Sequence, residues 1–487
     1  MRRLAWVLLG AAACTTVGPD YERPEIQTAD AWHQELTGGM FQGESDLASW
    51  WTVLNDPTLN SLIDRAGHGN LDLKIALARI MEARAQLKIA GADRLPDLNA
   101  FGGGARVRFS ADNPIIPPPV AADNTSIFAV GVDAAWEIDV WGRIDRQVDA
   151  ATGNFQASIE DRRDVRVTLY SEVALNYVGL RALQERRQIA ESNVETQRSS
   201  LQLAQSRFDA GLTSELDVKQ AETNLATTEA RIPRLDQGIV LAINRLGVLV
   251  GQQPHTLHKE LAKPMPIPLP PERIMLGVPA NLLRQRPDIR SSERRLAAQT
   301  ARIGVATADL YPRFSISGSF AWVAEDVGDL FGSSSRAFSI GVPFQWNVFD
   351  GGRIRANIKV QDARTEALLA AYEQSVLLAL EEVEGAMTSY ALEQVRRDAL
   401  QRAAESASRA AELSRDLYTK GLTDFQNVLD TERSKLEIQD LHADSRGRVT
   451  DNVIRLYKAL GGGWWTEEED ETTSEEGAEK RTEPDKK

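Results

Sequence analysis

Most of the sequence consists of two similar copies of one segment, and this long-period repeat limits the possible folds more than any other feature. Three pairs of segments carry it: 70–73 with 286–289, 92–96 with 308–312, and 142–144 with 352–354. The offset is 216 residues in the first two pairs and 210 in the third. The difference falls where the first copy alone carries the proline-rich segment 113–119, which is loop by composition. The chain is therefore expected to contain one structural unit twice.

The repeat divides the chain of 487 residues into segments. The first copy spans 57–251, a proline-rich linker spans 252–272, and the second copy spans 273–461. The final segment, 462–487, is predicted to be an acidic disordered tail because it lacks apolar periodicity. The net charge of the chain is −14, which argues against nucleic acid as a partner, since phosphate binding needs a basic surface.

The N-terminus has the parts of a secretory signal in residues 1–13. Arg2 and Arg3 precede an apolar run, which ends in small residues before Cys14. Cys14 is the only cysteine, so it cannot form an internal disulfide bond. Its position resembles the lipobox of bacterial lipoproteins, in which the thiol is acylated. The segment 14–56 is therefore expected to start with a lipid anchor; the alternative is a bystander cysteine within a signal peptide.

Each copy is predicted to run helix, strand, loop, strand, long helix, turn and helix. Apolar and polar residues alternate over Phe128–Ile138, Phe314–Trp322 and Phe338–Val348, which indicates strands with one apolar and one polar or small face. Such segments, about 10–12 residues long with aromatic ends, are typical of membrane-barrel strands. Residues 98–110 fit less well, because Phe101, Val107 and Phe109 have the opposite parity. This predicts either a bulge or a slip in the alignment of the copies.

Four strands per chain are too few to close a barrel, because the smallest barrels have about eight. Eight strands from two chains would enclose only their own side chains, so an open lumen indicates three or more chains, and three chains would give twelve strands. The alternative is a water-soluble sandwich. After residue 14 no window holds 18 consecutive apolar residues, so no transmembrane helix is expected.

Two proline-free stretches, 142–208 and 353–418, predict very long helices. At the usual rise per residue each would span about 100 Å. The shorter predicted helices, 57–94 and 214–249, could stack end to end beside a long one. The fold class is thus α+β, with a membrane sheet continuing into a long coiled coil.

Several motifs resemble the TolC-like outer-membrane factors, in particular efflux lipoproteins of the OprM/NodT type. They are the segment 14–24 (CTTVGPDYERP), the segment 277–290 (GVPANLLRQRPDIR), and the strand-to-helix corners 136–144 and 347–354. The resemblance extends from Cys14 to about Gly462 and implies a homotrimer. Its twelve-stranded β-barrel would lie in the cell outer membrane of a Gram-negative bacterium and continue into a periplasmic α-helical tunnel. The segment 14–56 would then include an equatorial part.

The resemblance also implies the activity, which is that of the exit duct of a tripartite efflux pump. The duct would passively conduct small molecules that an inner-membrane pump of the resistance–nodulation–division kind expels through a periplasmic adaptor. One alternative is a duct for type I protein secretion, although the lipobox and the Arg-Pro-Asp-Ile motif favour efflux. Another is a non-transport lipoprotein with a structural coiled-coil stalk.

The turns after the long helices are the candidate functional sites. Gly211 and Gly421 are predicted to end these helices in the left-handed conformation. Thr213 or Ser214, and Thr423 or Asp424, can cap the helices that follow. By resemblance, the turns close the entrance and meet the adaptor through Gly211, Leu212, Thr213, Gly421, Leu422 and Thr423.

The resemblance further implies a periplasmic gate lined by acidic side chains, with Asp217, Asn427, Asp430 and Tyr418 as candidates. One aspartate per chain would become a ring of like charges that repel at close range. Asn427 stands where TolC has a gate aspartate, and Thr423 stands where TolC has a gate arginine, so the bonding of the gate would differ. The alternative is that each carboxylate is simply solvated on a helix surface.

The sequence contains no constellation that indicates an enzyme. His255 and His258 lie in the linker without cysteine or paired acids, so no metal site is expected. Gly102–Gly104 lies in a predicted strand rather than in a phosphate-binding loop before a helix. We therefore predict no cofactor, no metal and no catalytic residue.

Overall fold

The computed structural model describes residues 16–27, 29–34, 36–43, 47–108, 110, 124–271 and 273–464. Cys14, the signal segment and almost all of the predicted tail lie outside these residues. The chain forms two compact units. Unit 1 comprises 1–25, 78–159 and 291–373, and unit 2 comprises 26–77, 160–290 and 374–487. Each unit therefore draws on both copies of the repeat.

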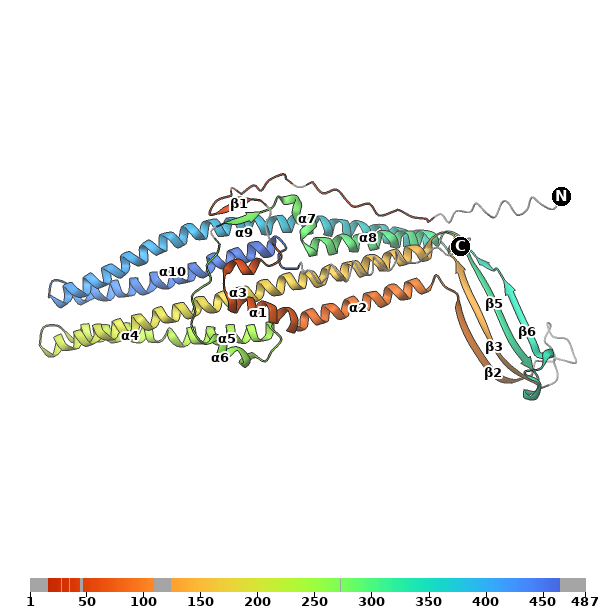
Figure 1. Ribbon diagram of the computed structural model, residues 1–487, viewed down its shortest axis with the longest axis horizontal. Helices are drawn as coiled ribbons and strands as arrows, with labels where there is room; N and C mark the ends of the chain where they lie inside the picture. The colour runs from red at the N-terminus through yellow and green to blue at the C-terminus, as the bar shows by residue number, and fades with distance from the viewer. Residues whose placement is uncertain are drawn as a thin grey trace. The chain divides into compact units, whose positions relative to one another are not determined.

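Unit 1 contains an antiparallel sheet with strands from both copies of the repeat (Figure 1). Its strands are β2 (Asp97–Val107), β3 (Thr125–Ile138), β5 (Arg313–Ala324), β6 (Arg336–Gly341) and β7 (Phe344–Gln345). The order is β2-β3-β5-β6, and β7 pairs with β5 beyond the end of β6. The strand predicted over 338–348 is therefore interrupted and shorter than expected. Pro343 lies at the break, because proline has no N–H to donate to the ladder.

The weakly patterned strand β2 pairs with β3 without a bulge. The register is continuous from Asp97 opposite Ala135 to Val107 opposite Thr125. The odd parity of Phe101 and Val107 is therefore explained by a slip in the alignment of the two copies rather than by an extra residue. Phe109 lies outside the described residues.

The helices of unit 1 pack closely beside one another. They are most of α2 (Leu71–Ala92), most of α8 (Pro287–Ala308), and the first parts of α3 (Arg143–Asp209) and α9 (Arg353–Thr419). A Cβ atom added at Gly153 of α3 would lie 2.9 Å from the Cβ atom of Ala298 in α8. On the other side of α8, Gln299 Nε2 donates to Gln361 Oε1 of α9 over 2.9 Å. Helix α8 of the second copy thus lies between the two long helices.

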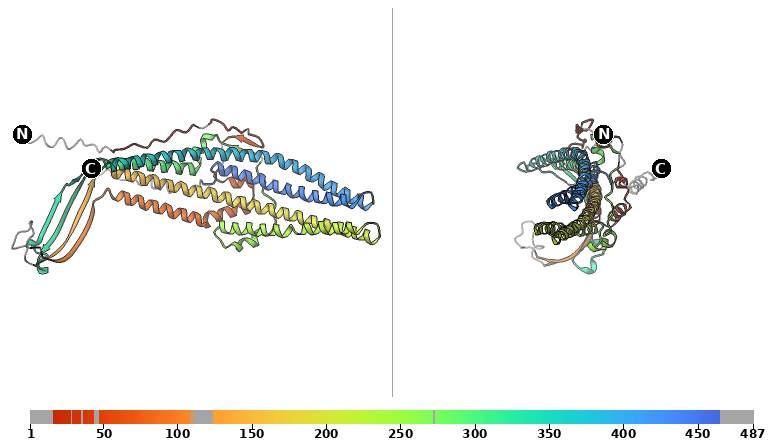
Figure 2. Two further views of the ribbon diagram at one scale, coloured as in Figure 1. Left: turned by 180° about the vertical axis from the view of Figure 1, so that it is seen from behind. Right: turned by 90° about the vertical axis from the view of Figure 1, so that its left-hand side faces the viewer.

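Unit 2 contains the remaining parts of α3 and α9, each followed by an antiparallel helix (Figure 2). Its other helices are α1 (Pro57–Gly69), α4 (Glu215–Glu229), α5 (Ile232–Leu249), α6 (His258–Leu261), α7 (Leu282–Gln285) and α10 (Phe425–Ala459). The 3₁₀ helices of both units, within the described residues, are η1 (Trp50–Leu54), η3 (Pro254–Leu257), η4 (Pro279–Asn281), η5 (Val327–Asp329) and η6 (Ser333–Ser335). A short parallel pair, β1 (Met40–Gln42) with β4 (Ile274–Leu276), was not expected from the sequence.

The two long helices are confirmed and have the same length, 67 residues each. The two shorter helices predicted over 57–94 and 214–249 are each broken. Asn70 interrupts the first because its side chain accepts the backbone N–H groups of Asp72 and Leu73, which starts a new helix. The second breaks between α4 and α5, where Pro233 lies in the first turn of the new helix. Within the described ranges, every helix is too short or too polar to cross a membrane.

Candidate functional site

The sheet of unit 1 has one apolar face. Residues directly opposite each other in a ladder lie on the same face. Val132 faces Phe320, and Phe320 in turn faces Phe338. Further pairs on this face are Val130 with Trp322, Trp136 with Ile316, Ile138 with Phe314, and Phe314 with Phe344. The predicted alternation is confirmed. It places the large apolar side chains of β3, of β5, and of β6 with β7 on one face of the sheet.

The opposite face of the sheet is polar or small. Asp133 faces Ser319, and Ser319 faces Ser339, with 2.8 Å between the two serine hydroxyl oxygens. Phe101 of β2 also lies on this face, opposite Gly131. The apolar face is the more exposed at its outer strand, where Phe338 is 81% and Ile340 79% exposed. Such a surface is compatible with lipid on one side and water on the other.

Tryptophans mark the corners where the strands meet the helices. Trp136 Nε1 donates to the carbonyl oxygen of Arg94, and Trp346 Nε1 donates to that of Leu310, both over 3.0 Å. These two bonds are equivalent under the repeat. Trp141 stacks on Tyr311, with ring centroids 4.6 Å apart. Aromatic side chains with a satisfied polar atom are typical of membrane–water interfaces.

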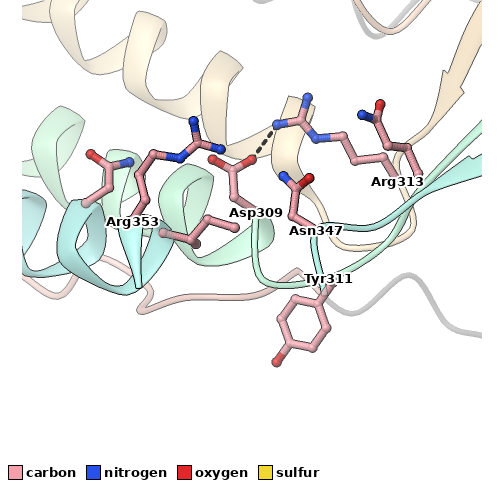
Figure 3. Close-up of a pocket in the computed structure, with 8 residues that line it drawn as sticks. Asp309, Tyr311, Arg313, Asn347 and Arg353 are labelled. Carbon is pink, nitrogen blue, oxygen red and sulfur yellow. Dashed lines mark hydrogen bonds and ion pairs between the residues drawn. The ribbon is translucent and has the colours of Figure 1, made fainter. Parts of the chain in front are cut away.

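The corner of the second copy also contains a polar cavity of about 460 Å³ (Figure 3). Its lining includes Asp309, Tyr311, Arg313, Asn347 and Arg353. Asp309 forms an ion pair with Arg313 across the cavity. The lining contains no histidine, cysteine, serine or lysine.

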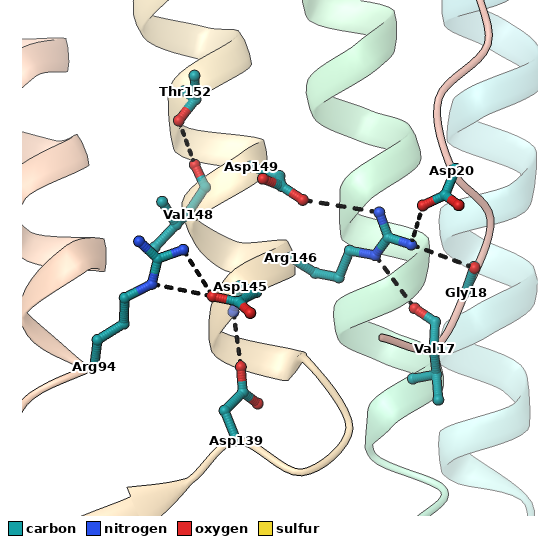
Figure 4. A network of polar contacts seen from close by, with 10 residues as sticks. All are labelled: Val17, Gly18, Asp20, Arg94, Asp139, Asp145, Arg146, Val148, Asp149 and Thr152. Carbon is teal, nitrogen blue, oxygen red and sulfur yellow. Dashed lines mark hydrogen bonds and ion pairs between the residues drawn. The ribbon is translucent and has the colours of Figure 1, made fainter. Parts of the chain in front are cut away.

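The segment that follows Cys14 is fastened to the corner of the first copy (Figure 4). Val17 N–H donates to the carbonyl oxygen of Trp141 over 3.1 Å. Arg146 donates to the Val17 carbonyl oxygen over 3.3 Å and to Asp20 Oδ1 over 2.6 Å. A Cβ atom added at Gly18 would lie 2.4 Å from the Cα atom of Gly304 in α8, so glycine is required at this crossing. Residue 16, two positions after Cys14, is thereby held at the strand-to-helix corner.

The two helix turns of unit 2 have the predicted glycine geometry. Gly211 and Gly421 both have φ = 72°. Gly211 N–H donates to the Phe208 carbonyl oxygen and Leu212 N–H to that of Arg207, both over 2.8 Å. The second copy forms the same two bonds. This is a Schellman motif, and it leaves Leu212 67% and Leu422 70% exposed at the outermost positions.

The predicted capping by side chains is wrong in detail. Ser214 and Asp424 occupy the N-cap positions with extended backbone, but neither side chain accepts a capping hydrogen bond. The threonines bond instead one turn into the helix: Thr213 Oγ1 donates to Asp217, and Asn427 Nδ2 donates to Thr423 Oγ1 over 2.7 Å. Asp217 and Asn427 are therefore equivalent residues with equivalent partners in the two copies.

The remaining gate candidates occupy different environments. Asp430 is exposed and accepts a hydrogen bond from Gln426 Nε2 over 2.9 Å. Tyr418 is only 3% exposed, and this burial raises the pKa of its phenol. It belongs to an apolar cluster that joins both hairpins: Ala204, Val218, Ala221, Tyr418, Phe425, Val428 and Leu429. Gate candidates are thus brought together near the turns, with Tyr418 inside and Asp430 outside.

Sequence reasoning missed Arg207, which connects the two hairpins. Its Nη1 donates to the Tyr418 carbonyl oxygen over 2.9 Å, and its guanidinium lies 4.7 Å from the centroid of the Tyr418 ring. Arginine near a helix C-terminus is common for reasons of the helix dipole alone. No pattern in one sequence therefore distinguished this contact from an ordinary surface charge.

No cluster of three metal-ligating side chains occurs in the part of the chain that the structure describes. The geometry consists instead of an amphipathic sheet with aromatic corners, and of paired helical hairpins whose turns carry exposed leucines and carboxylates.

The comparisons with known proteins agree with this geometry. The sequence profile of the family "Outer membrane efflux protein" matches residues 62–252 and 278–462. The pyoverdine export outer membrane protein OpmQ of Pseudomonas aeruginosa is 32% identical over 460 residues, covering 94% of this chain and 95% of OpmQ. The solvent efflux pump outer membrane protein SrpC of Pseudomonas putida is 30% identical over 465 residues, covering 94% and 97%.

Solved structures show the same likeness in three dimensions. The outer-membrane channel OprN superimposes with a TM-score of 0.86 at 37% identity, covering 92% of this chain and 99% of OprN. The chain belongs to the outer membrane efflux protein family. It is an outer-membrane efflux channel, and this family is a class of channels rather than of enzymes.

Proposed function

We propose that three copies of this chain assemble into a lipid-anchored exit duct that passively conducts small molecules out of the cell. The observation that carries this proposal is the sheet of unit 1. Its apolar face is exposed, its other face is polar, and in the described residues β2 and β6 each have a neighbour on one side only. Open edges and an exposed apolar face are both unfavourable in water and are both satisfied in a closed barrel in lipid.

The number of copies follows from the sheet. Each chain contributes four strand positions, with β6 and β7 sharing the last one. Pairing β6 of one copy with β2 of the next gives twelve strands for three copies, enough for a water-filled lumen. The serine and glycine face would line that lumen, and the tryptophan corners would lie at the membrane interface.

The lipid anchor is supported by the position of the segment after Cys14. Thr16 and Val17 lie against Gly142 and Trp141 at the aromatic corner. Cys14 lies two residues before Thr16, so an acyl group on it would be attached within about 7 Å of chain from this corner. Replacing Cys14 by serine should abolish incorporation of radiolabelled palmitate, and unchanged labelling would contradict this assignment.

The hairpin turns are proposed as the gated periplasmic entrance and the adaptor-binding surface. Leu212 and Leu422 are exposed at equivalent positions and suit apolar contacts with the hairpin of a periplasmic adaptor. Asp217 and Asp430 would form acidic rings around the axis, with Asn427 and Tyr418 beside them. The energy for transport would come from an inner-membrane pump of the resistance–nodulation–division kind. The names of OpmQ and SrpC, pyoverdine export and solvent efflux, support small molecules as cargo.

The decisive experiment uses the full-length protein purified from membranes in detergent. Mass determination should give a trimer, and its addition to planar lipid bilayers should give cation-selective channels. Proteoliposomes with entrapped solutes provide a second measure of the lumen. A monomer that leaves bilayers electrically silent would overturn the proposal and favour a structural coiled-coil stalk.

A further inference from the structure

The seam between the two hairpins of unit 2 contains polar layers about one heptad apart. Helices α3 and α10 run antiparallel along it. Arg186 of α3 forms an ion pair with Asp440 of α10 at 2.7 Å. Three further pairs are regularly spaced: Glu185 with Arg446 at 2.7 Å, Asn193 with Gln439 at 3.0 Å, and Ser200 with Glu432 at 2.5 Å. Their numbers rise by eight and seven on α3 and fall by seven at each step on α10. This is the spacing of core positions in a coiled coil.

Glu432 is the most deeply buried charge in these three layers, at 2% exposure. Its Oε1 accepts the Ser200 hydroxyl of α3, and its Oε2 accepts the Asn224 Nδ2 group of α4 over 3.4 Å. Asn224 is in turn fixed by Arg433 Nε, which donates to its Oδ1 over 3.0 Å. One carboxylate of the second hairpin therefore bonds to both helices of the first.

The environment of Glu432 is set by groups on every helix around it. Burial raises the pKa of its carboxyl, while the Ser200 hydroxyl, Arg415 of α9 and Lys435 of α10 oppose that rise. A carboxylate in such a place costs free energy that an apolar side chain of similar size would not. Its presence therefore requires a reason other than stability alone.

Register supplies that reason. Two helices that meet through alanine, valine and leucine can slide by a turn or rotate at little cost, because one apolar contact replaces another. A buried hydrogen-bonded pair has one arrangement in which all its polar atoms are satisfied, and every other arrangement leaves them unpaired. On the turn side of Glu432 the hairpins meet in the apolar cluster that contains Val218 and Phe425, and then through Arg207 at the turn itself. The Glu432 layer is thus the last polar layer of the three before the turns.

We propose that Glu432 is a positioning residue that fixes the register of the second hairpin on the first and thereby holds the entrance closed. The proposal rests on the proposed function of the turns as a gate. Asp430 lies two residues before Glu432 on α10, and Asp217 lies two turns before Asn224 on α4. A change in register at this layer would displace both carboxylates, so Glu432 acts on the gate without touching what passes through it.

The test is the basal conductance of full-length trimers in planar bilayers, with four variants. Glu432→Leu replaces the polar layer by an apolar one of similar volume. Glu432→Gln keeps both an acceptor and a donor at the same place. Ser200→Ala removes one partner with minimal change in packing. Glu437→Leu removes an exposed carboxylate on the same helix and serves as the matched control.

Glu432→Leu should raise the open fraction about tenfold, because one charge-assisted hydrogen bond changes a two-state population by roughly that factor. Its melting temperature should stay at or above that of the wild type. Ser200→Ala should act in the same direction, and Glu432→Gln and Glu437→Leu should conduct like the wild type. This pattern separates positioning from stability, because a merely structural residue would change melting and conductance together.

Glu432→Leu trimers that conduct like the wild type would overturn the inference. If that variant does not assemble, Ser200→Ala decides: wild-type conductance there would overturn it equally. Wild-type protein that forms no trimer and no channel would instead defeat the proposed function, and the positioning role would be lost with it.

Discussion

The two copies of the repeat share a backbone and differ in what surrounds it. Trp136 and Trp346 make the same hydrogen bond, and Gly211 and Gly421 have the same dihedral angle. Yet Glu222 of the first copy pairs with Lys219 at the surface, while its equivalent, Glu432, is buried. The two copies therefore keep the same backbone geometry at equivalent positions, while their side chains differ according to the neighbours of each copy.

The corners show the same contrast. In the first copy Arg143 forms a two-bond ion pair with Glu137, with distances of 2.8 and 2.9 Å. The equivalent residues of the second copy are Arg353 and Asn347, which line the polar cavity without such a pair. In the sheet each copy supplies one inner strand, β3 or β5, and one edge strand, β2 or β6, so the strand order alone does not produce this difference.

The strongest test of this contrast uses Gly131 and Gly341, which are equivalent under the repeat. A Cβ atom at Gly131 would lie 2.5 Å from the Phe320 carbonyl oxygen, whereas one at Gly341 meets nothing within 4 Å. Gly131→Val should therefore cost about 3 kcal/mol or more, because backbone cannot move aside. The measurement is the content of folded sheet by circular dichroism and the yield of trimer on detergent gels.

Gly341→Val sharpens the comparison. If β6 pairs with β2 of another copy, the valine would meet that strand, so the trimer yield should fall while the chain itself folds. An unaffected trimer in Gly341→Val would show that this edge stays open. Wild-type yield in Gly131→Val would contradict the observed packing of β3 against β5.

The second test concerns charge at the entrance, where Asp217 and Asn427 are equivalent. Asp217→Asn and Asp430→Ala should each lower the preference for cations, since each removes three like charges from a threefold ring. Asn427→Asp should raise it by adding three. Reversal potentials across a salt gradient measure the preference, and low ionic strength enlarges the effect. An unchanged reversal potential in all three variants would remove these residues from the gate.

The third test compares Arg207 with its equivalent, Leu417. Arg207→Leu removes the hydrogen bonds to the Tyr418 and Thr419 carbonyl oxygens and the cation–π contact. The loss should be about 1–2 kcal/mol, confined to the turns. Amide hydrogen exchange should quicken over 204–218 and 418–429 and stay unchanged over 57–69. Leu417→Ala, which touches no such link, is the control, and equal exchange in both variants would contradict a special role.

Much of this fold could be predicted because it depends on local and periodic features. Proline-free stretches gave the long helices, alternation gave the faces of β3 and β5, and glycine at the turns gave the left-handed ends. Each of these patterns occurs in both copies of the repeat, which strengthened the prediction. Breaks that depend on one side chain, such as the Asn70 cap and the Pro343 interruption, were missed because their signal is a single residue within a strong pattern.

The candidate site was predictable only in part, for a different physical reason. The turns could be predicted because a glycine at the end of a long helix indicates a left-handed residue without any knowledge of tertiary contacts. Arg207, Glu432 and the contacts of residues 16–21 depend on chain segments more than 100 residues away. Periodicity reports which face of a helix is apolar, but Glu222 and Glu432 occupy the same place in that pattern. Only the packing of the hairpins decides which carboxylate is buried.

The smallest expected effect again separates equivalent positions, Asp451 and Leu241. Leu241 is 59% exposed, whereas burial raises the pKa of Asp451 to about 7 from an ordinary 3.8. Arg455 and Arg448 oppose this rise, and Asp444 adds to it. The folded chain therefore holds a proton that the unfolded chain releases near pH 4. The stability from this carboxyl is full below that pH and is lost as the pH rises through about 7.

Asp451→Asn cannot titrate, so the wild type should melt a few degrees lower, relative to the variant, at pH 8 than at pH 5. Burial also raises the pKa of Asp164, to about 6. Asp164 is present in both proteins, so its contribution cancels in the difference between their melting temperatures. Parallel melting curves at both pH values would show that Asp451 is solvated in the assembled protein, as Leu241 is exposed in the single chain.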